Sequence, residues 1–222
     1  MLDRFVPVAR FARTSRPFAA FQRWRLRRWL SGPRSGLAPS IYKQREVLRY
    51  AEAFGLSILV ETGTFYGAMV LGIFRRFKQV YTIELQPQLH RRAVRMFRGD
   101  PGVIPICGDS AVELEKVIRE LDQAALFWLD AHYCGEGTAY ANVNTPVRRE
   151  LECILADPQP GHVVLIDDAH DFGRLADYPA IPEIEALVAS LRPGHQFRVA
   201  GDIIRIHEPR DDLPGFAPDT GG

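Results

Sequence analysis

Short apolar segments alternate with amphipathic segments over most of the chain. From residue 40 onward, five strand-sized apolar runs are each followed by a segment with helical spacing of apolar side chains, and two further runs close the pattern. Strands are predicted at 57–61, 79–84, 103–107, 124–130, 162–168, 196–200 and 203–207. Helices are predicted at 40–54, 68–77, 87–98, 110–121, 145–156 and 181–191. Gly201 and Asp202 separate the last two strands and predict a tight hairpin turn.

The predicted strands show no clear alternation of polar and apolar side chains, which is typical of strands that helices cover on both faces. Five strand–helix units and a hairpin predict an α/β fold: a Rossmann-like, doubly wound, mostly parallel seven-stranded sheet with a C-terminal antiparallel hairpin. Ser40 is expected to cap the first helix, and Ser110 with Glu113 to form a capping box at the start of 110–121. In such a sheet, ligands bind beyond the carboxyl ends of the strands.

The pattern divides the chain of 222 residues into an arm and linker at 1–39, one domain at 40–208 and a tail at 209–222. The tail is rich in Pro, Gly and Asp, and is expected to be disordered. No apolar run approaches the roughly 18 residues of a membrane span. The cysteines show no CxxC spacing, which fits a reducing cytoplasm: Cys107, Cys134 and Cys153. We therefore expect a cytoplasmic protein.

Charge is distributed unevenly between the arm and the domain. Residues 1–40 hold nine arginines and one acid, Asp3, so they carry +8 while the rest of the chain carries −7. The arm also contains six aromatic residues: Phe5, Phe11, Phe18, Phe21, Trp24 and Trp29. This composition is typical of an interfacial helix on anionic lipid, which predicts peripheral membrane contact through residues 1–36.

Other roles for the arm stay open. It can dock on its own acidic domain or on a second subunit of a homo-oligomer, which is the simplest use of a basic segment beside an acidic body. It also has features of an organelle transit peptide, or of a segment that contacts nucleic-acid phosphates. No specific nucleic-acid partner is expected.

Acidic residues recur where the predicted strands end. Four strands end in acids and one is followed by an acid, and the residues are Glu61, Glu84, Asp109, Asp130, Asp167 and Asp168. Because parallel strands end at the same edge of a sheet, these carboxylates are expected to gather there. Like-charge repulsion opposes such a gathering unless cations or hydroxyl donors meet the acids. The pattern therefore predicts a ligand site at this edge.

The turn after the first strand reads Glu61-Thr62-Gly63-Thr64-Phe65-Tyr66-Gly67. Gly63 permits a tight turn with close approach of a ligand, and Gly67 allows the next helix to pack near the strand. An acid at position 61 replaces the first glycine of the dinucleotide-binding fingerprint. A carboxylate there repels a pyrophosphate and suits an ammonium or sulfonium group.

Two more acids follow at regular intervals. Glu84 lies 23 residues after Glu61, where a carboxylate can accept hydrogen bonds from both hydroxyls of a ribose. Asp109 lies 25 residues further on and precedes Ser110. These motifs resemble the class I S-adenosylmethionine-dependent methyltransferases over roughly residues 56–207. The resemblance implies S-adenosylmethionine as cosubstrate, with Glu61, Gly63 and Gly67 around its methionine part, Glu84 on the ribose, and Asp109 with Ser110 near adenine.

The acids after strands four and five add a second resemblance. Asp130, Asp167 and Asp168 are similar to the metal set of catechol-type and macrolide or aminocoumarin sugar O-methyltransferases. Hard oxygen ligands suit Mg²⁺, and the resemblance implies that these three residues hold it. The ion would lower the pKa of a bound substrate hydroxyl. Asp130 and His132 are the expected catalytic residues, with His132 as general base and His170 as the second candidate.

Residues 133–144 are Gly-rich, polar and aromatic, which predicts a mobile lid or substrate loop. Tyr133 and Tyr140 could stack there on a sugar or aromatic acceptor. The sequence thus predicts Mg²⁺-assisted O-methylation of a hydroxylated small molecule. Two alternatives are a Rossmann-like metal-dependent hydroxylase or hydrolase, and a non-catalytic membrane- or partner-binding module on the same fold.

Overall fold

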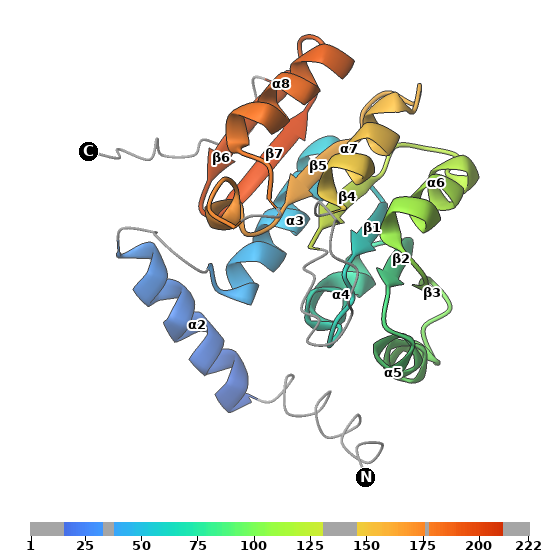
Figure 1. Ribbon diagram of the computed structural model, residues 1–222. Coiled ribbons are helices and arrows are strands. Elements are labelled where there is room, and N and C mark those ends of the chain that lie inside the picture. The colour runs from blue at the N-terminus through green and yellow to red at the C-terminus, as the bar shows by residue number, and fades with distance from the viewer. Residues whose placement is uncertain (1–15, 33–37, 131–145, 176–177, 211–222) are drawn as a thin grey trace.

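A seven-stranded sheet lies at the centre of the computed structural model, which describes residues 16–32, 38–130, 146–175 and 178–210 (Figure 1). The strand order is β3-β2-β1-β4-β5-β7-β6. The first five strands pair in parallel, and β7 runs antiparallel to both β5 and β6. The strands are β1 (Ile58–Thr62), β2 (Gln79–Glu84), β3 (Val103–Cys107), β4 (Leu126–Leu129), β5 (Val163–Ile166), β6 (Gln196–Ala200) and β7 (Ile203–His207). The predicted fold class is confirmed.

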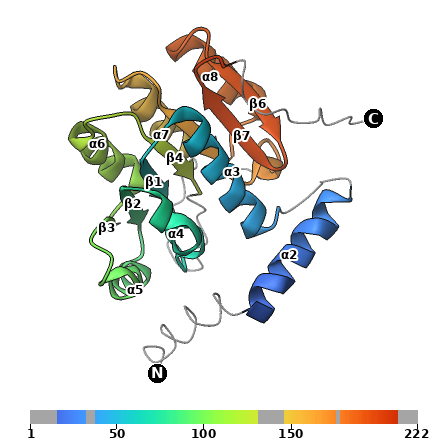
Figure 2. The ribbon, with the colours of Figure 1, turned by 180° about the vertical axis from the view of Figure 1, so that it is seen from behind.

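Helices cover both faces of this sheet, as the two opposite views show (Figures 1 and 2). One face packs against α6 (Ser110–Glu120), α7 (Val147–Ala156) and α8 (Ile181–Leu191). The other packs against α3 (Ser40–Phe54), α4 (Ala68–Ile73) and α5 (Pro87–Phe97). The remaining helices are α2 (Arg16–Leu30) and the short 3-10 helices η1 (Phe74–Arg76) and η2 (Ala169–Asp171). None of the described helices is long and apolar enough to cross a membrane.

Strand β4 is apolar throughout because its successive side chains enter two different cores. In β4, Phe127 and Leu129 join the core under α6, α7 and α8, whereas Leu126 and Trp128 join the core under α3, α4 and α5. All four side chains are buried. A strand that is buried on both faces has no polar side to display, which accounts for the missing alternation.

Two predicted helix caps are wrong. Ser40 is the first helical residue of α3, and its side chain does not cap the helix, because the carbonyl of Pro39 already accepts from the backbone N–H groups of Tyr42 and Lys43. Asp109, not Ser110, caps α6: its carboxylate accepts a hydrogen bond from the backbone N–H of Ala111 at 3.0 Å. A charged acceptor interacts more favourably than a hydroxyl with the positive end of a helix dipole.

The predicted hairpin turn is confirmed. Gly201 and Asp202 have φ angles of 54° and 67°, and Ala200 pairs with Ile203 across the turn. Two left-handed residues in succession match the right-handed twist of the strands that they join. The turn places Asp202 beside the start of η2, where the carbonyl of Asp202 accepts from the backbone N–H of Ala169 at 3.1 Å.

A buried ion pair attaches α3 to the antiparallel part of the sheet. Arg205 of β7 is fully buried, and its Nη2 lies 2.7 Å from Oε2 of Glu46 on α3. The same guanidinium donates to the carbonyl of Ile203 at 2.8 Å. Arg49 donates to Glu46 from the next turn of α3 at 2.9 Å. The carboxylate therefore has two cationic partners, which offset the cost of burying it.

Replacing Arg205 by Met is expected to lower the free energy of unfolding by about 3–5 kcal/mol, because Glu46 keeps its burial and loses one cationic partner. Urea denaturation followed by circular dichroism measures the change. Arg91→Met, at an exposed position of α5, is the control and should change stability by about 0.5 kcal/mol or less. Equal losses in both variants would contradict the structural role of the Arg205–Glu46 pair.

Candidate functional site

The turn between β1 and α4 folds back onto the end of β2. Gly63 and Gly67 have φ angles of 84° and 71°, in the left-handed region that favours glycine. The backbone N–H groups of Gly63 and Thr64 both donate to the carbonyl of Ile83, at 2.9 and 3.2 Å. A Cβ atom at Gly67 would lie 3.2 Å from Sδ of Met96. Both glycines are therefore needed for this close turn.

Glu61 lies at the base of this turn with 1% of its surface exposed. Its carboxylate accepts a hydrogen bond from the hydroxyl of Thr82, which also lies 2.5 Å from the hydroxyl of Thr64. Burial raises the pKa of Glu61 well above its ordinary value, and the nearby carboxylates of Asp130 and Glu84 raise it further, against the hydrogen bond from Thr82. The structure thus brings acids at the ends of β1, β2 and β4 close together, as expected for parallel strands that end at one edge.

The end of β2 is fixed by backbone hydrogen bonds. Glu84 accepts from the N–H of Phe65 through Oε2 at 2.7 Å and from the N–H of Gln86 through Oε1 at 2.9 Å. The carbonyl of Glu84 accepts from the N–H of Gly108 at 3.1 Å, which brings the start of α6 and its cap Asp109 alongside. Each carboxylate oxygen can accept a further hydrogen bond. The two backbone N–H groups therefore hold the Glu84 carboxylate in one orientation at this edge.

The acids after β4 and β5 form a compact cluster. Asp130, Asp167 and Asp168 each offer a carboxylate oxygen, and these oxygens lie within 4.8 Å of one another. Asp168 adopts a left-handed conformation with φ of 49°, and its backbone N–H donates to Oδ1 of Asp167 at 2.8 Å. This local turn directs two consecutive carboxylates to the same side of the chain. We call the three residues the acidic cluster.

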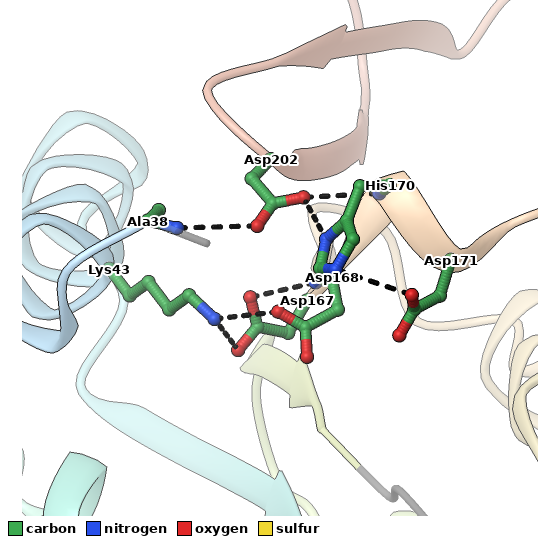
Figure 3. Close-up of polar contacts among 7 residues, drawn as sticks. All are labelled: Ala38, Lys43, Asp167, Asp168, His170, Asp171 and Asp202. Carbon is green, nitrogen blue, oxygen red and sulfur yellow. Dashed lines mark hydrogen bonds and ion pairs between the residues drawn. The ribbon is translucent and has the colours of Figure 1, made fainter. Parts of the chain in front are cut away.

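Lys43 of α3 reaches into the acidic cluster (Figure 3). Its Nζ lies 2.7 Å from Oδ2 of Asp167 and 2.8 Å from Oδ1 of Asp168, and 13% of its side chain is exposed. Burial by itself lowers the pKa of Lys43, but the two carboxylates raise it above its ordinary value, so the group carries a positive charge. Burial also raises the pKa of Asp167, and the charge of Asp130 adds to this against Lys43.

The cluster has the ligand chemistry and the charge that a divalent cation requires. If all three carboxylates are ionised, they and the ammonium of Lys43 together carry two negative charges, which a divalent ion would balance. Carboxylate oxygens are the ligands that Mg²⁺ prefers. The chemistry of the acidic cluster therefore fits a divalent cation such as Mg²⁺.

His170 lies at the border of the acidic cluster, in η2 (Figure 3). Its Nδ1 lies 2.8 Å from Oδ1 of Asp202, and its Nε2 lies 3.2 Å from Oδ1 of Asp171. His170, Asp202 and Asp168 also offer ligand atoms within 4.8 Å of one another. Asp202 orients the imidazole beside the cluster, which keeps His170 as a candidate base. His132, Tyr133 and Tyr140 lie outside the described residues, so their assignments remain predictions.

A fully buried carboxyl group lies behind the edge. Glu150 of α7 packs beside the hydroxyls of Ser110 and Thr62, at the ends of α6 and β1. Burial raises its pKa to about 7, although the two hydroxyls oppose the rise. We therefore expect Glu150 to change its protonation state near neutral pH, beneath the residues predicted to lie near adenine.

Sequence reasoning missed four of these residues: Lys43, Thr82, Glu150 and Asp202. One signal pointed to Lys43, because the gathered acids require a cation and the chain has only three lysines against 25 arginines. The pattern of apolar positions gives no such signal for Glu150, which occupies a core position of an otherwise regular amphipathic helix.

Comparison with known proteins finds likeness in fold. No protein-family profile and no curated protein sequence matches the chain. An O-methyltransferase from Bacillus cereus, solved with S-adenosylhomocysteine, superposes with a TM-score of 0.58 at 14% identity, over 94% of this chain and 100% of that one. The O-methyltransferase TomG from Streptomyces achromogenes, solved with S-adenosylmethionine, superposes with a TM-score of 0.51 at 16% identity, over 77% and 80% of the two chains.

A third structure is the MycE methyltransferase of the mycinamycin pathway, solved with Mg, S-adenosylhomocysteine and mycinamycin VI. It superposes with a TM-score of 0.52 at 15% identity, over 80% of this chain and 51% of that one. The chain therefore has the Rossmann-like fold of the class I S-adenosylmethionine-dependent methyltransferases.

Replacing Lys43 by Met is expected to lower the free energy of unfolding by about 3 kcal/mol at about pH 8 with EDTA present, because two buried carboxylates lose their cation. This loss of stability should be smaller at about pH 5, because protonation of the carboxylates reduces the negative charge that Lys43 no longer balances. Urea denaturation at both pH values measures it. Lys116→Met is the matched control, since Lys116 pairs with Glu113 on an exposed surface. A pH-independent loss would contradict the electrostatic role of Lys43.

Glu150→Gln is expected to change how stability depends on pH. A carboxyl whose folded pKa is raised stabilises the fold at low pH, and this contribution disappears as pH rises from about 4.5 through about 7. The amide of the variant stays neutral at every pH. Its free energy of unfolding should therefore rise relative to that of the wild type by up to about 3 kcal/mol as pH increases from about 4.5 to about 7. Urea denaturation at several pH values tests this. Parallel profiles for the two proteins would show that Glu150 does not titrate there.

Proposed function

We propose that the protein transfers the methyl group of S-adenosylmethionine to a hydroxyl oxygen of a small molecule. The observation that carries this proposal is the convergence of Glu61, Glu84 and the acidic cluster at the carboxyl edge of the sheet. In this fold, that edge is where ligands bind. The three similar structures named above hold S-adenosylmethionine or S-adenosylhomocysteine, which supports the choice of donor.

The donor site would be built from three turns. Glu84, held by two backbone N–H groups, would accept hydrogen bonds from the ribose hydroxyls. Gly63 and Gly67 let the backbone approach the methionine part, and Asp109 with Ser110 would lie near adenine. Glu61 would face the cationic end of the donor. Because its raised pKa comes from burial among like charges, an arriving cation would favour its ionised form.

The acidic cluster would hold Mg²⁺ through Asp130, Asp167 and Asp168. MycE, which has the same fold, was solved with Mg. When bound, the ion would lower the pKa of a substrate hydroxyl. Lys43 would stay at the side of the site, holding Asp167 and Asp168 in place.

The chain's own residues would then supply orientation and proton transfer. His132 is the first candidate to remove the hydroxyl proton, and His170, oriented by Asp202, is the second. The substrate oxygen forms a bond to the methyl carbon as the carbon–sulfur bond breaks, and the sulfonium becomes a neutral thioether. Since the donor is already activated, alignment of the two reactants supplies most of the rate. Neither the hydrolase or hydroxylase nor the non-catalytic module gains support from the structural comparisons.

Calorimetric titration with S-adenosylhomocysteine tests the donor site. Wild-type protein should bind it at micromolar concentration, and Glu84→Gln should weaken binding by about tenfold or more, because a charged acceptor for two hydroxyls is lost. Asp130→Ala should bind it within about threefold of the wild type. The same Asp130 variant should lose methyl transfer to a panel of catechols and hydroxylated sugars with Mg²⁺ present.

Asp122→Ala is the matched control, since Asp122 is an exposed acid at the opposite end of β4. It should change neither donor binding nor transfer. Loss of both properties in Asp130→Ala would assign this residue to the fold instead of the chemistry. A wild-type protein that does not bind S-adenosylhomocysteine would refute methyl transfer.

A further inference from the structure

Helix α2 carries two apolar strips, and one of them packs against α3. Leu26 is buried at 5% exposure, and the ring of Trp29 packs against Tyr42 of α3 with centroids 4.5 Å apart. These contacts join α2 to the outer side of α3 (Figures 1 and 2). On the other side of the helix, Phe21 and Trp24 are 51% and 53% exposed. A helix that served only to pack on α3 would need no second apolar strip.

The second strip combines aromatic rings with arginines. Phe21, Trp24 and Arg28 follow at spacings of three and four residues, so they share one side of the helix. The rings of Phe21 and Trp24 stack with centroids 6.0 Å apart, and the guanidinium of Arg28 lies 5.6 Å from the Trp24 ring. Arg25 and Arg27 are exposed beside them. We call these five residues the outer α2 face.

The outer α2 face belongs to a helix that is strongly basic. The 15 residues of α2 include five arginines and no acid, whereas residues 41–222 of the chain carry net −7. We propose that the outer α2 face binds peripherally to an anionic lipid surface, with Phe21 and Trp24 in the headgroup region and the arginines on lipid phosphates. The side chains of Trp24 and the arginines combine an apolar body with a polar end, and Phe21 adds a purely apolar ring, which suits this face to the boundary.

The geometry favours lipid over a protein partner. A stable protein interface needs about 800 Å² on each side with complementary shape, which five side chains along a helix of about 22 Å do not supply by themselves. A bilayer surface requires no matching shape. With 15 residues and five charges, α2 is too short and too polar to cross the bilayer, so it would lie in the interface. This inference does not depend on the proposed methyl transfer.

Vesicle co-sedimentation of the full chain tests the proposal. The wild type should sediment with vesicles of phosphatidylcholine containing about one-third phosphatidylglycerol, and about tenfold less with phosphatidylcholine alone. Phe21→Ser with Trp24→Ser should lower the partition coefficient by about tenfold or more, because the apolar anchor is lost. Arg25→Gln, Arg27→Gln and Arg28→Gln together should remove the preference for anionic vesicles. Added salt should weaken wild-type binding.

Matched controls change the same residue types elsewhere. Arg75→Gln with Arg76→Gln neutralises an exposed arginine pair on η1, and Leu191→Ser replaces an exposed apolar side chain at the end of α8. Both should bind vesicles as the wild type does. The proposal is overturned if the wild type does not bind anionic vesicles. It is also overturned if the variant with Phe21→Ser and Trp24→Ser, the serine pair, binds them as tightly as the wild type does. It also fails if light scattering shows a dimer that the serine pair dissociates, or if the full chain binds duplex DNA more tightly than vesicles.

Discussion

Like-charge repulsion at the carboxyl edge of the sheet is the constraint on which the site depends. Parallel strands bring Glu61, Glu84, Asp130, Asp167 and Asp168 to one edge, and burial there makes their charges costly. The protein meets this cost with fixed partners: the hydroxyl of Thr82, backbone N–H groups and the ammonium of Lys43. The charge that remains is what a sulfonium donor and a divalent ion would neutralise.

The position of Lys43 follows from a second buried ion pair. Lys43 and Glu46 lie one turn apart on α3, and Glu46 is held by Arg205 of β7 at 2.7 Å. The same helix therefore contacts β7 through a carboxylate and the acidic cluster through an ammonium. Asp202, in the turn before β7, accepts from the backbone N–H of Ala38 and orients His170. Helix α3, the hairpin and the candidate site thus form one connected unit.

The succession of strands along the chain and the acids at their ends could be predicted because both follow from local periodicity. An apolar run that ends in an acid marks a strand end, and the parallel arrangement then places all such ends together. The turn glycines at 63 and 67 could be predicted for the same reason, since a strand that turns directly into a helix needs residues that tolerate positive φ. Helix caps were harder to predict than strand ends. Asp109 and Ser110 are both good capping residues, and the choice between them depended on where the first turn of α6 begins.

The sequence by itself determined the succession of elements, the doubly wound sheet and the edge where the acids gather, because these depend on side chains close together along the chain. Only the tertiary structure decided the partners of the acids. Lys43 meets Asp167 across 124 residues, and Asp202 meets His170 across 32. Such pairs depend on how α3 and the hairpin pack against the sheet, and no local pattern encodes that distance. The same holds for Glu150, whose raised pKa comes from burial in a core that several distant elements form.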